Sequence, residues 1–139
     1  MSTIHRFEEI EAWQTARALT KIVYEFTASG SFARDFGLRD QMRRASVSIM
    51  SNIAEGFESR TSALFLEFLG RAKGSAGELR AQCYAAEDAG YLAQDQFESL
   101  RALCEKCSGQ ISSFMAYLKS NAPAPKRSNI STFKPSNDA

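Results

Sequence analysis

The chain has 139 residues and a formal net charge of +1, and 44% of its residues are hydrophobic. This length fits one domain with a buried core, and the small net charge excludes bulk charge as a means of attracting nucleic acid. Any nucleic-acid binding would therefore need basic side chains that cluster locally. No apolar run approaches the roughly 18 residues of a membrane span, and the first residues lack a signal-peptide core. We therefore expect a cytoplasmic protein that makes no membrane contact.

The first helix is expected at about residues 8–28, where apolar residues recur every three or four positions. A serine and glycine run then breaks the helix, and residues 29–35 are expected to form a loop. Phe32 and Phe36 are expected to cover the end of the helices there. The apolar stripe of this first helix consists of Ala12, Ala16, Leu19, Val23 and Phe26.

The second helix is expected at about residues 36–56. Asp35 suits its N-cap, because a short carboxylate accepts from free amides at a helix start, and Gly56 suits a left-handed residue at its end. Its apolar stripe consists of Leu38, Met42, Ala45, Ile49 and Ile53. A second, polar stripe at the same spacing consists of Gln41, Arg44, Ser48, Asn52 and Glu55. A polar stripe of this kind is either solvated surface or a seam between subunits.

The third helix is expected at about residues 62–89. Its apolar stripe consists of Phe65, Phe68, Ala72, Ser75, Leu79, Cys83 and Ala86. Gly70, Gly74 and Gly77 are unusual inside a helix, because each costs up to ~1 kcal/mol relative to alanine. One interpretation is that they allow close packing against a neighbouring helix. The other is a flat patch where an RNA backbone or a partner chain can approach.

The fourth helix, at about residues 95–119, carries two of the three cysteines. Cys104 and Cys107 form a C-x-x-C motif, which is also typical of redox sites and of half a zinc site. Both positions, however, fall on the apolar stripe of this helix, and a free buried cysteine behaves as a small hydrophobic residue. The third cysteine, Cys83, has no second motif near it, and an odd number argues against a disulfide framework. We therefore expect core cysteines, with no metal and no cofactor.

Four amphipathic helices with short connections and no strand signals predict an all-α protein, an antiparallel up-and-down four-helix bundle over residues 1–120. Residues 121–139 have several prolines and few apolar groups, so a flexible, disordered tail is expected there. Lys126, Arg127 and Lys134 make this tail basic.

Several blocks of the sequence resemble a known family. The stretch 37–49 reads GLRDQMRRASVSI, and 52–56 reads NIAEG. With AWQ at 12–14 and AKGS at 72–75, they resemble the signature of the 23S rRNA intervening-sequence (S23) family of small bacterial four-helix bundle proteins. A related branch is the accessory variability determinant protein of diversity-generating retroelements. The resemblance covers about residues 7–118.

The resemblance implies a ring-like homopentamer, and its retroelement branch implies binding to a reverse transcriptase and to nucleic acid. One departure concerns the first loop, where Phe32 is followed by Ala33 and not by the proline common in the family. The resemblance therefore does not extend to the geometry of that loop.

The sequence offers candidates for a nucleic-acid surface. Arg39 and Arg43 are neighbours at i,i+4, and arginine gives directional contacts to phosphate. The predicted nucleic-acid-binding residues are Arg39, Arg43, Arg44, Arg60, Arg71 and Lys73. They predict an oligomeric nucleic-acid-binding or ribonucleoprotein accessory protein whose ligand is RNA or DNA.

An assembly scaffold is the alternative, in which the arginines form salt bridges between subunits and nucleic acid has no role. The predicted oligomer-interface residues are Arg44, Ser48, Asn52, Glu55 and Glu78. The only histidine, His5, has no catalytic partner in a recognisable pattern, and no nucleophile–base arrangement is evident. We therefore expect no catalytic residues and no enzyme activity.

Overall fold

The computed structural model describes residues 3–121. Its elements are a 3-10 helix η1 (Phe7–Glu9) and the α-helices α1 (Glu11–Phe26), α2 (Gly30–Arg34), α3 (Phe36–Glu58), α4 (Ser62–Asp88) and α5 (Gln94–Ser120). These residues contain helices and no strand, so the all-α prediction is confirmed. The predicted tail lies outside the described residues from residue 122 onward.

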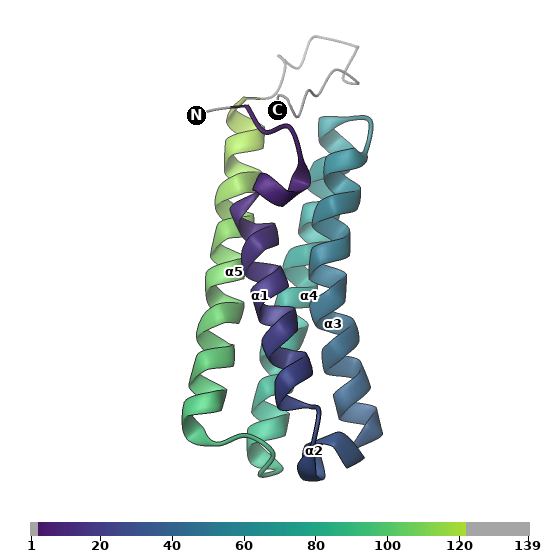
Figure 1. Ribbon diagram of the computed structural model, residues 1–139. Helices are drawn as coiled ribbons and strands as arrows, with labels where there is room; N and C mark the ends of the chain where they lie inside the picture. The colour runs from purple at the N-terminus through teal and green to yellow at the C-terminus, as the bar shows by residue number, and fades with distance from the viewer. Residues whose placement is uncertain (1–2, 122–139) are drawn as a thin grey trace.

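The four long helices lie side by side as a helical bundle (Figure 1). α1 contacts α3 and α5, and α4 contacts the same two helices from the other side. The short helix α2 lies at one end of the bundle with the α4–α5 connection, and the α3–α4 turn lies at the opposite end (Figure 1). Tyr91 in the α4–α5 connection joins the first of these ends together, because its hydroxyl donates to Asp35 Oδ2 (2.9 Å) and its ring stacks on Phe32 (5.0 Å between centroids).

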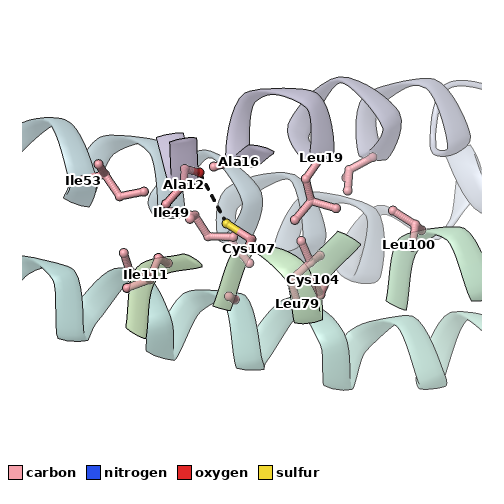
Figure 2. Packing of buried hydrophobic residues seen from close by; sticks show 14 of the residues in the cluster. Ala12, Ala16, Leu19, Ile49, Ile53, Leu79, Leu100, Cys104, Cys107 and Ile111 are labelled. Atoms are coloured by element: carbon pink, nitrogen blue, oxygen red, sulfur yellow. Dashed lines mark hydrogen bonds between the residues drawn. The ribbon is translucent and has the colours of Figure 1, made fainter. Parts of the chain in front are cut away.

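The core lies along the middle of the bundle, where side chains of all four long helices meet (Figure 2). The predicted stripes of the first and second helices face it, although Phe26 and Leu38 are only partly buried, and so does the stripe of the fourth helix that contains Cys104 and Cys107. On α4 the prediction was partly wrong. Leu69 and Ala76 are buried there, while Phe68 and Ser75 lie at the edge of the buried face.

The predicted N-cap of α3 is confirmed, and α4 also begins with a side-chain cap. Leu38 N donates to Asp35 Oδ1 (3.1 Å) at the start of α3, and Leu64 N donates to Thr61 Oγ1 (3.1 Å) at the start of α4. The first helix starts later than expected, because Ile10 is extended (φ −76°, ψ 123°) and separates η1 from α1.

Gly56 does not end its helix, which corrects the sequence-based assignment. α3 continues to Glu58, and Gly56 lies buried inside it. A Cβ built on Gly56 would lie 2.8 Å from Phe65 Cδ1 and 2.9 Å from Phe68 Cβ. The missing side chain therefore lets α4 approach α3 closely, and this position needs glycine for packing and not for a left-handed turn.

The segment expected to be a loop contains α2. Phe32 is buried in it, as expected for a residue that covers the end of the bundle. Phe36 is 63% exposed, so its predicted role there was wrong. The reason is its place at the start of α3, where its ring faces outward and lies under the guanidinium of Arg39 (4.8 Å to the ring centroid).

The three glycines of α4 do not pack against another helix of this chain. Gly70, Gly74 and Gly77 are exposed, and no atom lies within 4 Å of a Cβ built on any of them. The interpretation of close packing within the chain was therefore wrong. The surface interpretation is the one that agrees with their position on the outer face of α4.

Candidate nucleic-acid interface

Arg43 is anchored at the C-terminal end of α1. Its Nε donates to Thr27 Oγ1 (2.9 Å), and its guanidinium carbon lies 4.4 Å from the centroid of the Tyr24 ring. Thr27 is held in turn, because its hydroxyl donates to the carbonyl of Val23 (2.8 Å). A positive charge also suits the negative end of the α1 helix dipole. The Arg43 side chain is therefore fixed between α1 and α3, with its guanidinium on an aromatic face.

Arg39 is anchored one turn earlier, at the end of α2. Its Nη1 donates to the carbonyl of Ala33 (2.9 Å) and its Nε donates to Asp40 Oδ1 (2.9 Å). Its side chain is 25% exposed, with the guanidinium over Phe36. The short helix that sequence analysis missed therefore supplies one of the groups that position this arginine.

Arg44 differs from these two arginines. It is exposed, and within residues 3–121 it forms no hydrogen bond, ion pair or ring contact. Together with Tyr24, Arg43 and Val47 it lines a shallow hollow of about 510 Å³ on the outer side of α3. Arg44 is thus free to contact a ligand, while its neighbours are held in place.

We call these side chains the arginine–aromatic surface; its members are Tyr24, Phe36, Arg39, Arg43, Arg44 and Val47. Tyr24 is 43% exposed and Val47 39% exposed, so apolar and aromatic area lies between the guanidinium groups. Asp40, paired with Arg39, also lines the hollow, which leaves the positive charge in excess. Guanidinium groups bind phosphates, and exposed rings can stack on bases.

The remaining predicted nucleic-acid residues do not join this surface. Arg60 lies in the α3–α4 turn, at the end of the bundle opposite to α2 (Figure 1). Arg71 pairs with Glu67 on its own helix (3.0 Å). Lys73 is two residues from Ser75, which faces α3, so it points away from α3. The structure thus brings together only Arg39, Arg43 and Arg44 of the six.

Two of the predicted interface residues bond within the chain. Ser48 and Ser75 share a hydrogen bond between α3 and α4 (2.9 Å), and Asn52 Nδ2 donates to the Ser48 carbonyl (2.9 Å). Arg44 and Glu78 line a hollow of about 280 Å³ beside this bond but form no ion pair with each other. Glu55 is exposed farther along α3.

The aromatic members of the surface were not recognised from the sequence. Tyr24 follows the core residue Val23, and Phe36 precedes the helical stripe of α3, so neither falls at a core position. The sequence did contain a signal for them: an aromatic residue that lies off the apolar stripe, one or two helical turns from an arginine, indicates an exposed ring that a guanidinium can stack on. The partner of Tyr24 is 19 residues away in sequence, however, and only the packing of α1 on α3 identifies it as Arg43.

A comparison with protein families identifies the relatives of this chain. The family model described as 23S rRNA-intervening sequence protein matches residues 8–113, most of the sequence. The chain belongs to this family. Among solved structures, it is similar to a protein of unknown function from the S23 ribosomal protein family of Bacteroides thetaiotaomicron VPI-5482, with a TM-score of 0.70 and 20% sequence identity. The match covers 76% of this chain and 95% of that one, and it shows a shared fold. No curated protein matches the chain.

In this member of the 23S rRNA-intervening sequence family, the C-x-x-C motif is part of the core, as predicted. Cys83, Cys104 and Cys107 are all buried, and the thiol of Cys107 donates to the carbonyl of Ala12 (3.5 Å; Figure 2). Burial raises the pKa of the Cys107 thiol to about 12. Residues 3–121 contain no group of three or more His, Cys, Asp or Glu side chains that could hold a metal ion. No helix in that range is both long and apolar enough to cross a bilayer.

Proposed function

We propose that the protein is a non-enzymatic accessory protein that binds RNA or DNA through the phosphate backbone, using the arginine–aromatic surface. The observation that carries this proposal is that Arg39 and Arg43 stack on the exposed rings of Phe36 and Tyr24, with the unpaired Arg44 beside them in the hollow that Tyr24 and Val47 line. Phosphate binding alone would require only the charge. The rings of Tyr24 and Phe36 add a face on which unpaired bases can stack, which favours a single-stranded ligand.

The anchored arginines keep donors for a ligand. A guanidinium has five N–H donors in a planar fork. Arg43 uses its Nε within the chain, and Arg39 uses Nε and Nη1, so the other donors of both groups are available. Their positions are fixed before binding, which reduces the entropy that binding would otherwise cost. Arg44 contributes an exposed positive charge beside them. Backbone contacts of this type position a protein without reading the base sequence.

We further propose that the protomer is an antiparallel up-and-down four-helix bundle that assembles as a ring-like homopentamer in the cytoplasm. A ring would repeat the arginine–aromatic surface once per subunit, so that one nucleic-acid strand could contact several copies. A relation to the retroelement accessory protein, and a reverse transcriptase or another nucleic-acid-processing protein as partner, stay predictions of the sequence resemblance.

An assembly scaffold is the second candidate function, and one observation favours it. Arg44 and Glu78 line the same hollow, yet neither forms an ion pair within residues 3–121. Both charges are therefore available to a neighbouring subunit. The exposed glycine face of α4 would also permit a close approach of another chain. In this case the arginines would act between subunits and not on phosphate.

The test is the affinity for a labelled single-stranded RNA, measured by fluorescence anisotropy at several salt concentrations. The variant is Arg44→Gln, which removes a charge without breaking a hydrogen bond, ion pair or ring contact in the described part of the chain. The control is Lys119→Gln in the last turn of α5, which removes the same net charge at a distant exposed site. If Arg44 contacts phosphate, its loss should lower the slope of log K against log salt by about 0.7, while the control leaves the slope unchanged.

Light scattering on the same proteins separates the two functions. Under the nucleic-acid proposal, Arg44→Gln keeps the mass of the oligomer and loses RNA affinity. If the substitution dissociates the oligomer and the wild-type protein ignores RNA even at low salt, the scaffold is favoured. Wild-type protein with no RNA affinity at low salt would refute nucleic-acid binding directly.

A further inference from the structure

The first half of α1 carries a further arginine that lies over an aromatic ring. The guanidinium carbon of Arg17 is 5.9 Å from the centroid of the Trp13 ring. Trp13 is held by the ring of Phe7, which meets it edge to face (5.2 Å between centroids), and it packs against the core while staying partly exposed. This arrangement repeats the pair of Arg43 and Tyr24 near the other end of the same helix.

Helical spacing connects the two pairs. Four residues follow one another at steps of four, three and four: Trp13, Arg17, Thr20 and Tyr24. Residues at these steps lie on the same face of a helix. Because Tyr24 contacts Arg43 of α3, this face borders α3, which lies beside α1 along the bundle (Figure 1). We call these four residues the α1 track, and its last residue belongs to the arginine–aromatic surface.

Arg17 keeps its whole set of donors for a ligand. It is exposed, and within residues 3–121 it forms no hydrogen bond or ion pair, so its five N–H groups are available to a phosphate. The nearby carboxylates do not cancel this charge. Asp40 is paired with Arg39, and Glu25 lies about 100° around the helix from Tyr24. The track and the surface together carry an excess of positive charge, which complements a chain of phosphates.

The separation of the two ring–guanidinium pairs suits a short strand. Trp13 and Tyr24 are eleven residues apart on α1, which at a rise of 1.5 Å per residue is about 17 Å. At roughly 3.4 Å per phosphate of a stacked strand, this length corresponds to about five nucleotides. Thr20 between the pairs is uncharged, and its hydroxyl donates to the carbonyl of Ala16 (2.8 Å). No negative charge on this face of α1 therefore interrupts the path.

We propose that one single nucleic-acid strand binds along the α1 track and contacts both pairs at once. One base stacks on the Trp13–Arg17 pair, Arg17 donates to a phosphate, and the strand continues to Tyr24 and Arg43. Aromatic rings and guanidinium planes stack on unpaired bases, so the ligand is single-stranded over this length. The strand path rests on the proposed nucleic-acid function and adds to it a direction and a minimum length of about five nucleotides.

Trp13 is the only tryptophan of the chain, so its fluorescence reports on this end of the path. The probe is a uridine oligomer of about eight nucleotides, longer than the track, titrated into the full-length protein. The same oligomer with a fluorescent label gives the overall affinity by anisotropy. We expect saturable quenching of Trp13 emission with the midpoint of the anisotropy signal. Binding by anisotropy with unchanged Trp13 emission overturns the strand path and leaves the proposed function standing.

Arg17→Gln tests the phosphate contact. Loss of one such contact should lower the slope of log K against log salt by about 0.7 for the uridine oligomer. Lys119→Gln removes the same charge from an exposed site in the last turn of α5 and should leave the slope unchanged. Circular dichroism checks the fold of both variants. A folded Arg17→Gln variant with the wild-type slope overturns the strand path.

Arg44→Gln tests whether one strand makes both contacts. A continuous strand requires that this variant shifts the midpoint of Trp13 quenching by the same factor as the anisotropy midpoint. The lost charge has little direct effect at Trp13, which lies about 17 Å along α1 from Tyr24, because salt at 0.1 M screens exposed charges beyond about 10 Å. An unchanged Trp13 midpoint means two separate ligands and overturns the proposal. No binding by either signal at low salt refutes the proposed function and the strand path with it.

Discussion

Gly56→Ala tests whether the close contact between α3 and α4 limits the stability of the bundle. The new Cβ would lie 2.8 Å from Phe65 Cδ1 and 2.9 Å from Phe68 Cβ, closer than carbon atoms approach without a shift. Phe65 cannot move freely, because it is fully buried and packs against the rings of Phe57 (6.2 Å) and Phe114 (5.5 Å). The strain must therefore separate the two helices or displace the aromatic cluster.

The expected magnitude follows from two opposing effects. Alanine is a better helix former than glycine, by about 1 kcal/mol inside a helix. Overpacking a buried position costs roughly 1–3 kcal/mol, and disturbed aromatic pairs cost about 0.5–1.5 kcal/mol each. We expect a net loss of about 1–2 kcal/mol in the free energy of unfolding. For a domain of this size the melting temperature would fall by roughly 3–10 °C.

Urea denaturation followed by circular dichroism measures this loss. The matched control is Gly74→Ala, the same substitution in the middle of α4 at an exposed site with no atom within 4 Å of the new Cβ. It should raise the stability of the protomer by up to about 1 kcal/mol, because only the helix preference changes. Opposite signs for the two variants are the expected result. If Gly56→Ala were as stabilising as Gly74→Ala, the close contact would not exist, and the reasoning would be refuted.

Three other outcomes are expected. Gln82→Leu should raise the free energy of unfolding by about 1 kcal/mol, because Gln82 is only 9% exposed and its Oε1 has no hydrogen-bond partner among residues 3–121; a loss of stability in urea denaturation would contradict this. Native protein should not react with Ellman's reagent, because all three thiols are buried and the pKa of Cys107 is raised; all three should react after unfolding. The hydrogen bond to Asp35 raises the pKa of Tyr91. This bond therefore stabilises the fold below about pH 10, and its stabilisation is lost as the pH rises through the higher pKa of the folded state. The difference in stability between wild type and Tyr91→Phe should therefore shrink above that pH, and a constant difference would argue against the assignment.

The arginines of α3 have two consequences for the design of such experiments. Arg43 and Arg39 hold α1 and α2 against α3, so substituting them would disturb packing as well as charge. A loss of RNA binding in those variants would not separate a ligand contact from a structural effect. Arg44 has no partner among residues 3–121, and it is therefore the position where a change in affinity reports on the ligand.

The sequence by itself determined the four long helices and most of the core. Spacing of three and four residues placed three of the long helices within about two residues of their observed bounds, and it identified the cysteines as core residues. Asp35 was recognised as an N-cap because a capping side chain bonds to an amide only three positions further along the chain. Such features are local, and local periodicity and hydrogen bonding are sufficient to specify them.

The tertiary structure decided what these helices present to each other and to solvent. It showed that Gly56 lets Phe65 of α4 pack closely on α3, that Arg43 stacks on Tyr24, and that the glycines of α4 face outward. It also formed a hollow beside Gln110 from segments about one hundred residues apart. Contacts between residues so distant in sequence depend on the rotation and register of packed helices, and periodicity fixes only which face of a helix is buried.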